Sequence, residues 1–459
     1  MIMWKLQKTP ETNPSETVEL SKPTAVKDRA PSVVVPVSNP MIALKVKIHQ
    51  QLLNRINLSL LDKLPREQIS NEISDIVSEI LVSDGEVLNR NERTALCSDV
   101  LDELLGLGPL EPLLKDETIN DILVNGYNSV FVERSGLLEK TTTRFQDERH
   151  LLRIIQKIVS AVGRRVDESS PFVDARLADG SRVNAIIWPL AIDGSLLSIR
   201  KFSKKPISME RMIEFGSITP EMATILRGIV AAGLNVIISG GTGSGKTTLL
   251  NALSSYIDEG ERIVTIEDSA ELQLQQDHVG RLETRPPNME GKGEVTQRDL
   301  VKNALRMRPD RIILGECRGG EAFDMLQAMN TGHDGSMTTI HANTPRDALS
   351  RIEMMIGMSG VEISPRSARS QIASAINVII QIGRLSDGKR KVLSLSEITG
   401  MEGEVITMQE IFKFSATGRD EGGNVIGRFM AAGIRPKFMG VLESQGIKLD
   451  HNVFAPTRV

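Results

Sequence analysis

The chain has 459 residues, of which 40% are hydrophobic and only 3% aromatic, and its formal net charge is −4. The length predicts about three domains, while the acidic balance and the scarcity of aromatic rings argue against a nucleic-acid-binding protein. The two cysteines, Cys97 and Cys317, exclude a disulfide scaffold and a four-cysteine zinc site, which fits a reducing cytosol.

The N-terminal residues show no membrane or export signal. No apolar run reaches the roughly 18 residues that a membrane-spanning helix needs, and the start, MIMWKLQKTPETNPSE, turns polar before a signal-peptide core can form. We therefore expect a cytoplasmic protein that reaches a membrane only through partners. Prolines among Ser, Thr, Glu and Lys predict a disordered arm over residues 1–40, either a simple tail or a partner-binding segment.

Helical periodicity begins after this arm and predicts a three-helix bundle over residues 41–106. Apolar side chains recur at helical spacing in three successive stretches. These are Ile48, Leu52 and Ile56; then Ile69, Ile73, Ile76, Val77, Ile80 and Leu81; then Leu96, Val100, Leu101 and Leu104. We expect the bundle to be a docking or assembly module ahead of the domains that follow.

Residues 107–212 mix strand and helix patterns and predict a small α+β domain. Alternating stretches at 121–126, 129–136, 181–190 and 194–202 are typical of strands, and the amphipathic stretch 148–162 is typical of a helix. The second half of this domain is rich in arginine, namely Arg176, Arg182 and Arg200. Taken singly, each of these arginines is a surface charge.

The remaining residues, 213–459, predict an α/β domain with a mostly parallel sheet, because strand, glycine-rich turn, helix and strand follow one another. The stretch NVIISGGTGSGKTTLL holds a complete phosphate loop between an apolar strand and a helix. Its backbone N–H groups would face the phosphates of a nucleoside triphosphate. Lys246 would reach the β- and γ-phosphates, and the Thr247 hydroxyl would bind Mg²⁺. The nucleotide-binding residues are Gly240, Gly241, Thr242, Gly243, Ser244, Gly245, Lys246, Thr247 and Thr248.

Two acidic segments follow buried strands, where α/β sheets place their sites. The strand Ile263–Ile266 runs into Glu267, Asp268 and Glu271. A second strand, Ile312–Leu314, is expected to stop at Gly315, immediately before Glu316. A phosphate loop needs a metal-binding acid and a residue that activates water, and these carboxylates supply the candidates.

A third polar segment, TGHDGSMTTIHANTP, carries His333 and His341. The spacing does not match a zinc pair on a helix, and no cysteines complete such a site. We expect a neutral histidine that senses the γ-phosphate or links it to a neighbouring subunit.

Four of these segments together resemble the secretion ATPases of the type II and type IV pilus superfamily: GGTGSGKT, IEDSAEL, RIILGECRGGEA and TGHDGSMTTIHAN. Within it, the chain is most similar to the CpaF/TadA-like ATPases of tight-adherence (Flp) pilus systems. That likeness rests on GLGPLEPLL, DARLADGSRVNAIIWPL, SIRKF, GMEGEVITMQEIFKF and GIRPKF, and it covers about residues 41–459. Two cysteines cannot build the four-cysteine zinc module of other branches, which also favours the Flp branch.

The resemblance implies a RecA-like P-loop core that binds ATP and Mg²⁺. It implies that Glu316 is the carboxylate on the Mg²⁺ side, that Glu271 is the general base, and that Glu267 and Asp268 organise the metal and its water. Other implied site residues are Arg182 and Arg200, which approach the triphosphate from the smaller domain, and His333 and His341. Cys317 stands where the family has a small aliphatic residue, and we expect it in the core.

The resemblance further implies a homohexamer that works with inner-membrane pilus platform proteins at the cytoplasmic face of the inner membrane. Pilus assembly, retraction and related protein secretion all fit such a motor. Two alternatives remain open: a nucleic-acid translocase with the same core fold, and a nucleotide-binding switch that does not turn over.

Overall fold

A computed structural model describes residues 44, 47–48, 51–52, 66–86, 88–134, 136–202, 206–287 and 291–455. The expected disordered arm, 1–40, lies outside the described residues. Contacts within the chain divide it into two units, Met1–Leu105 and Gly106–Val459. Among the described helices, none is long and apolar enough to cross a membrane.

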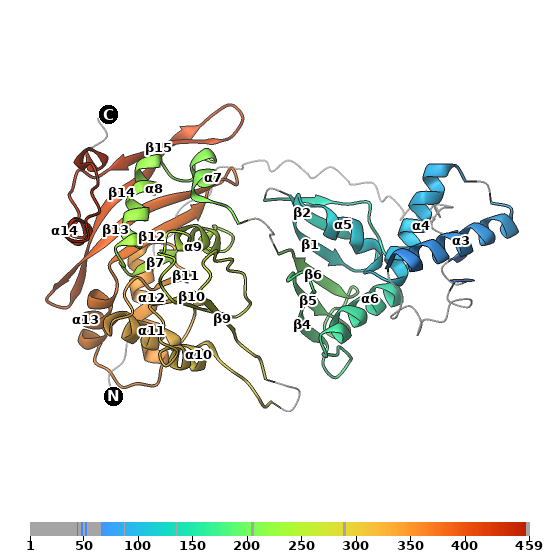
Figure 1. Cartoon of the computed structure of the whole chain (residues 1–459), viewed down its shortest axis with the longest axis horizontal. Helices are drawn as coiled ribbons and strands as arrows, with labels where there is room; N and C mark the ends of the chain where they lie inside the picture. The colour runs from blue at the N-terminus through green and yellow to red at the C-terminus, as the bar shows by residue number, and fades with distance from the viewer. Residues whose placement is uncertain are drawn as a thin grey trace, which may run out of the picture. The chain divides into compact units, whose positions relative to one another are not determined.

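The first unit contains the helices α3 (Arg66–Asp84) and α4 (Arg90–Leu104) (Figure 1). A capping box begins α4, where Asn89 accepts the Glu92 amide and the Glu92 side chain accepts the Asn89 amide. The predicted apolar stripes of both helices form one buried cluster, which also includes Leu44, Ile48 and Leu52. The rest of the first expected helix lies outside the described residues, so the three-helix bundle stays a prediction.

The second unit begins with η1 (Gly108–Leu110), α5 (Glu111–Lys115) and a six-stranded antiparallel sheet in the order β3-β2-β1-β6-β5-β4. The strands are β1 (Ile119–Asn125), β2 (Val130–Arg134), β3 (Leu137–Lys140), β4 (Phe172–Arg176), β5 (Arg182–Ile186) and β6 (Leu196–Arg200). Helix α6 (Glu148–Ala161) buries its apolar face with the sheet in one core. The strands β3 and β4 were not predicted, and β3 is exposed along its whole length, so it shows no buried face.

The large sheet has nine strands in the order β15-β14-β13-β12-β7-β11-β10-β8-β9 (Figure 1). Its parallel part consists of β7 (Val236–Ser239), β8 (Ile263–Glu267), β9 (Val279–Glu283), β10 (Arg311–Cys317), β11 (Met337–Ile340) and β12 (Val378–Arg384). Antiparallel strands extend it: β13 (Arg390–Glu402), β14 (Val405–Arg419) and β15 (Val425–Ala431). The fold class is therefore α/β.

Helices cover both faces of this sheet, as a doubly wound pattern requires. One core includes α7 (Met209–Glu214), α8 (Pro220–Ala231), α9 (Lys246–Ser254), α14 (Met439–Ser444) and η2 (His451–Phe454). The other includes α10 (Gln297–Ala304), α11 (Glu321–Asn330), α12 (Pro345–Met358) and α13 (Pro365–Ala375). Successive residues of β7 and β8 alternate between the two cores, so the cores lie on opposite faces.

The parallel order brings the carboxyl ends of β7, β8, β10 and β11 to one edge of the sheet. The phosphate loop, Glu267, Glu316 and His341 all lie at that edge. One expectation was wrong: β10 does not stop at Gly315 but continues through Glu316 to Cys317, with an irregular register against β11 after Leu314. Glu316 is therefore fixed by strand backbone and not by a loop.

Candidate functional site

The phosphate loop is shaped by its glycines. Gly243 and Gly245 have φ values of +67° and +96°, a left-handed conformation that side chains disfavour. At Gly240 a Cβ atom would lie 2.3 Å from the Ile382 carbonyl oxygen and 2.6 Å from Ser244 Oγ, so only glycine fits. The loop then enters α9 at Lys246, which leaves the first amides of that helix free to bind an anion.

Lys246 is buried and held by the loop itself. Its Nζ donates a hydrogen bond of 2.9 Å to the Gly241 carbonyl and lies 3.2 Å from Nε2 of His341. Burial, together with the nearby Arg318 charge, lowers the pKa of Lys246 against the opposing effect of Glu316. The ammonium group is thus preorganised beside the turn that would receive the phosphates.

Glu316 lies between two partners of different charge. Its Oε1 is 3.0 Å from His341 Nε2, and its Oε2 accepts a hydrogen bond of 2.7 Å from Arg318. Burial alone would raise the pKa of Glu316, but Arg318, His341 and Lys246 outweigh burial and lower it below the usual 4.5. Glu316 is therefore ionised at neutral pH, as a Mg²⁺ ligand must be.

Burial and the Lys246 charge lower the pKa of His341 below 6.5 despite Glu316, so the imidazole is neutral at pH 7. Lys246 and Glu316 both face Nε2, and a neutral ring can serve only one of them: it accepts from Lys246 or donates to Glu316. A charged ligand that binds next to Lys246 or Glu316 would therefore change which of the two residues bonds to His341.

The structure does not bring His333 to this site. β11 lies between the two histidines, and the His333 carbonyl accepts a hydrogen bond from Ser336, whose amide binds Asn235 at the amino end of β7. His333 therefore lies at the opposite edge of the sheet. Its expected contact with a phosphate bound to the same chain is corrected.

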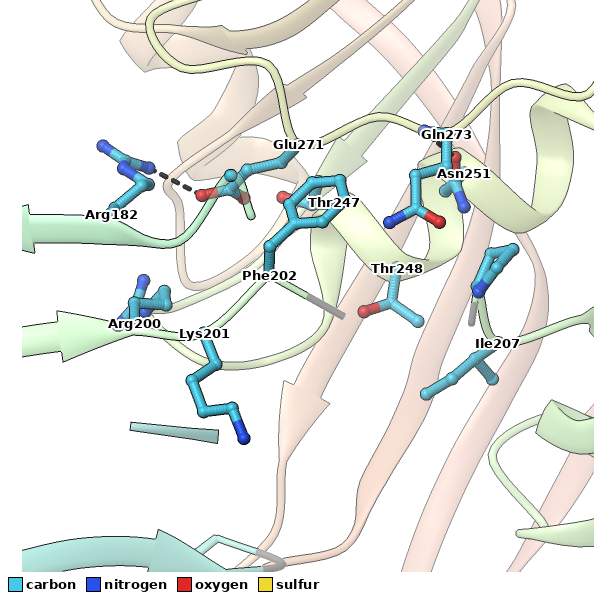
Figure 2. A pocket seen from close by; sticks show the side chains of 12 residues that line it. Arg182, Arg200, Lys201, Phe202, Ile207, Thr247, Thr248, Asn251, Glu271 and Gln273 are labelled. Atoms are coloured by element: carbon cyan, nitrogen blue, oxygen red, sulfur yellow. Dashed lines mark hydrogen bonds and ion pairs between the residues drawn. The ribbon is translucent and has the colours of Figure 1, made fainter. Parts of the chain in front are cut away.

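Glu271 reaches a pocket of about 190 Å³, which Figure 2 shows from close by. Its Oε1 accepts a hydrogen bond of 2.6 Å from Arg182 Nη1. The same pocket is lined by Thr247 and Thr248 from α9 and by Arg200. Five of the expected site residues thus converge here from the small sheet, from α9 and from the segment that follows β8.

The two arginines occupy directly opposed positions on β5 and β6. Like charges placed opposite each other destabilise a strand pair, so the arrangement suits an anion that both can bind. Arg182 pairs with Glu271, and Arg200 donates a hydrogen bond of 3.0 Å to Asp121. Burial would lower the pKa of Arg200, but Asp121 raises it, so the guanidinium stays charged.

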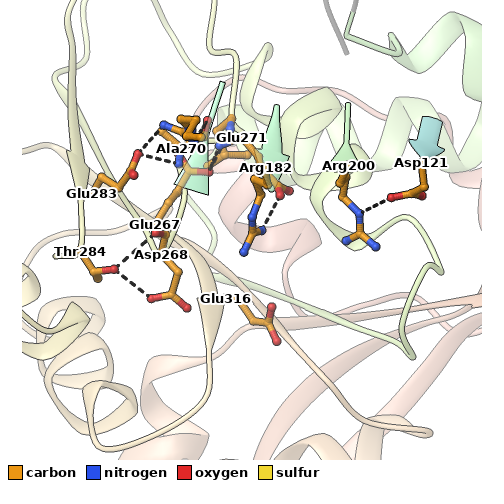
Figure 3. A network of polar contacts seen from close by, with 12 residues as sticks. Asp121, Arg182, Arg200, Glu267, Asp268, Ala270, Glu271, Glu283, Thr284 and Glu316 are labelled. Atoms are coloured by element: carbon orange, nitrogen blue, oxygen red, sulfur yellow. Dashed lines mark hydrogen bonds and ion pairs between the residues drawn. The ribbon is translucent and has the colours of Figure 1, made fainter. Parts of the chain in front are cut away.

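The remaining two expected acids have different environments (Figure 3). Asp268 accepts a 3.1 Å hydrogen bond from Arg318, which bridges it to Glu316. Glu267 is only 3% exposed, and its Oε2 accepts the backbone amides of Glu271 and Leu272 at 2.7 and 2.9 Å. This carboxylate therefore supports the backbone of the loop above it, and its expected role at the metal stays a prediction.

Mg²⁺ binding is consistent with the oxygen donors at this edge. The ionised Glu316 carboxylate and Lys246, the neighbour of Thr247, both lie within 3.2 Å of His341 Nε2. Within the described residues, no group of three or more His, Cys, Asp or Glu side chains could hold a metal. Mg²⁺ commonly takes one or two protein ligands and completes its shell with phosphates and water, so Thr247 and Glu316 fit that ion.

Three residues that form hydrogen bonds around the site were not predicted. Arg318 bridges two acids, Asn251 Oδ1 accepts the Gln273 amide at 2.9 Å, and Arg390 Nε donates to the Gly243 carbonyl at 2.9 Å. Arg176, noted only as a surface charge, binds Glu283 at 2.7 Å and the Ala270 carbonyl at 3.1 Å. Only Arg318 had a signal in the sequence, its place two residues after Glu316.

Comparison with known proteins identifies a family. The model described as "Type II/IV secretion system protein" matches residues 103–424. A conjugal transfer protein of Mycobacterium tuberculosis is 39% identical over 309 residues, which cover 66% of this chain and 87% of the relative. The type IV secretion system protein VirB11 of Bartonella henselae is 31% identical over 345 residues, which cover 67% and 96%.

A solved structure, the VirB11 ATPase from the Brucella suis type IV secretion system in complex with sulphate, is 28% identical and covers 62% of this chain and 94% of its own. Its TM-score of 0.34 is too low to support a structural argument. The family assignment rests on sequence, and the match to the family model spans the small antiparallel sheet, the phosphate loop and both acidic segments. The chain therefore belongs to the Type II/IV secretion system protein family.

Proposed function

We propose that the protein is a Mg²⁺-dependent ATPase that powers protein movement in a secretion or pilus system. The observation that carries this proposal is the convergence of Thr247, Thr248, Glu271, Arg182 and Arg200 on one pocket next to the phosphate loop. Family membership supports it.

In the proposed mechanism, the amides at the start of α9 and the Lys246 ammonium bind the phosphates. Bound Mg²⁺ would neutralise phosphate charge, and Thr247 and Glu316 would hold it. Glu271 takes a proton from the attacking water, while Arg182 and Arg200 stabilise the charge that develops on the transferred phosphoryl group.

The Arg182–Glu271 ion pair links binding to catalysis. Arg182 Nη1 occupies Oε1 of Glu271, an oxygen that the attacking water would need as its acceptor. A triphosphate offers Arg182 a stronger partner, and the exchange would release Glu271 to accept a proton. The neutral imidazole of His341 lies between Lys246 and Glu316, so its hydrogen-bond partner would change when phosphates bind Lys246.

Motifs such as GLGPLEPLL, SIRKF and GIRPKF favour one branch of this family. The protein is a CpaF/TadA-like member of a tight-adherence (Flp) pilus system, with a RecA-like ATP-binding core, and it acts as a homohexamer on inner-membrane pilus platform proteins from the cytoplasm. Its domains are an arm (1–40), a three-helix docking module (41–106), a small α+β domain (107–212) and the core domain (213–459). The division of contacts after Leu105 and the two separate sheets support this organisation.

The test is phosphate release by the purified protein with ATP and Mg²⁺, followed by imaging of surface pili in a strain that lacks the gene. Sustained release and loss of pili are expected. Normal pili in the deletion strain would contradict the pilus assignment while leaving the ATPase assignment intact.

A nucleic-acid translocase is the second candidate, because two relatives are named for conjugal transfer. Stimulation of the ATPase by DNA, in the absence of any pilus component, would favour it. The acidic net charge of −4 argues against it.

A further inference from the structure

Glu267 supports the segment that carries Glu271. The strand β8 ends at Glu267, and its side chain turns beneath residues 268–273, where Oε2 accepts the amides of Glu271 and Leu272. Asn251 accepts the next amide, that of Gln273. The backbone amides of three consecutive residues, 271–273, are therefore held by side-chain acceptors. The side chain of Glu271, the first of these residues, extends to Arg182 (Figure 3).

Gly315 provides the space that Glu267 occupies. β10 lies beside β8, with Leu314 paired to Ile266. A Cβ atom on Gly315 would lie 3.0 Å from Glu267 Cγ and 3.6 Å from Glu267 Cβ. The distance to Cγ is shorter than most contacts that real Cβ atoms make. Gly315 is not among the glycines with positive φ, so its own backbone does not require glycine. The glycine before Glu316 is explained by its neighbour on β8.

A buried carboxylate is costly at this position. Burial raises the pKa of Glu267 despite the two amide hydrogen bonds, and its buried Oε1 has no hydrogen-bond partner among the residues that the structure describes. An apolar side chain would avoid that cost but would leave the amides of Glu271 and Leu272 without an acceptor. The buried Glu267 carboxylate therefore lowers the stability of the fold, but it fixes the backbone at Glu271.

We infer that Glu267 is a positioning residue for hydrolysis: it holds the backbone of residues 271–272 so that the Glu271 carboxylate points into the pocket, and Gly315 admits it. The inference rests on the proposed function, in which Glu271 is the general base. It assigns no contact between Glu267 and nucleotide or metal.

The chain contains a matched control in Glu397. Like Glu267, it is 3% exposed, accepts two backbone amides, those of Lys437 and Phe438, and has a pKa that burial raises. Those amides belong to the C-terminal segment that packs into the core near Phe438, not to the segment with Glu271. Glu397→Ala therefore removes the acceptor of two backbone amides, as Glu267→Ala does, but from a segment that contains no site residue.

The experiment compares Glu267→Ala, Glu267→Gln, Gly315→Ala and Glu397→Ala in the full-length protein. Turnover and hydrogen–deuterium exchange of the peptide that spans 268–275 are measured for each. In Glu267→Ala we expect faster exchange there and a kcat lower by about 10²-fold, the usual cost of displacing a catalytic group by about 1 Å. The KM for ATP should stay within about twofold, since no nucleotide contact is lost.

The other variants separate positioning from general stability. Glu267→Gln keeps an oxygen for both amides and should recover kcat to within about fivefold of the wild type. Gly315→Ala crowds Glu267 and should lower kcat by about tenfold or more at unchanged KM, which also provides a test if Glu267→Ala does not fold. Glu397→Ala should lose thermal stability yet keep kcat within about twofold.

Wild-type kcat in Glu267→Ala or Gly315→Ala, an unchanged exchange rate in 268–275, or an equal loss of kcat in Glu397→Ala would overturn the inference. The proposed function fails in a different way. It fails if the wild type does not hydrolyse ATP, or if Glu271→Gln hydrolyses it at the wild-type rate.

Discussion

The substitution Arg182→Ala should lower kcat strongly but change the thermal stability only slightly. Its ion pair with Glu271 is 2.6 Å long, but the two side chains are 41% and 30% exposed. A pair this accessible contributes about 0.2–1 kcal/mol to the free energy of unfolding. For a chain of this size, Arg182→Ala should therefore lower the melting temperature by less than about 4 °C.

The catalytic effect should be much larger. An arginine that stabilises the transferred phosphoryl group contributes about 10³-fold or more to kcat, which corresponds to about 4 kcal/mol. Arg182→Ala should retain nucleotide binding, because Lys246 and the loop amides remain, and should lose turnover by that factor. The assays are steady-state phosphate release and equilibrium binding of a fluorescent ATP analogue.

Arg134 provides the matched control. It lies on β2 of the same antiparallel sheet and forms an ion pair of 2.5 Å with Asp116, the residue after α5. The two side chains are 36% and 31% exposed, and Arg134 does not line the pocket. Arg134→Ala should keep kcat within about twofold. A kcat for Arg182→Ala within a few-fold of the wild type, or an equal loss in Arg134→Ala, would refute the assignment of Arg182 to the transition state.

Three further predictions follow from the same geometry. Lys246→Ala should abolish hydrolysis and weaken ATP binding, because the buried ammonium at the phosphate loop is lost; wild-type turnover in this variant would exclude the site. Glu316→Gln should raise the Mg²⁺ concentration for half-maximal rate by about tenfold or more, and complete inactivity at saturating Mg²⁺ would instead indicate that Glu316 is the base. If the active form is a ring, activity per subunit should rise with protein concentration, and a flat profile down to concentrations where light scattering shows only monomer would rule out the ring.

The sequence predicted the parts of the site that depend on local rules. Gly243 and Gly245 have positive φ, a backbone requirement that arises within the loop itself. Fully buried strands such as β7 and β8 were recognisable as apolar runs. The exposed strand β3 offered neither an apolar run nor an alternating pattern.

The errors concern the direction of side chains and distances across the fold. Glu267 follows an apolar strand as Asp268 does, and nothing in the chain says that Glu267 turns inward while Asp268 meets Arg318. His333 and His341 are close in sequence, but β11 separates them along its length. Arg390 reaches the phosphate loop from an antiparallel strand 147 residues further along the chain than Gly243, a pairing that no local pattern encodes.

The central claim is that Glu271 is the base of an ATPase and that Arg182, Arg200 and Thr247 line the pocket that Glu271 reaches. Its most direct test is to measure ATP binding and phosphate release in parallel for the wild type and for Glu271→Gln at saturating Mg²⁺. The amide can orient a water but cannot take its proton, so the variant should bind ATP as the wild type does and release phosphate at least about 10²-fold more slowly. Equal phosphate release by the two proteins, or a wild type that binds ATP and releases none, would contradict the account.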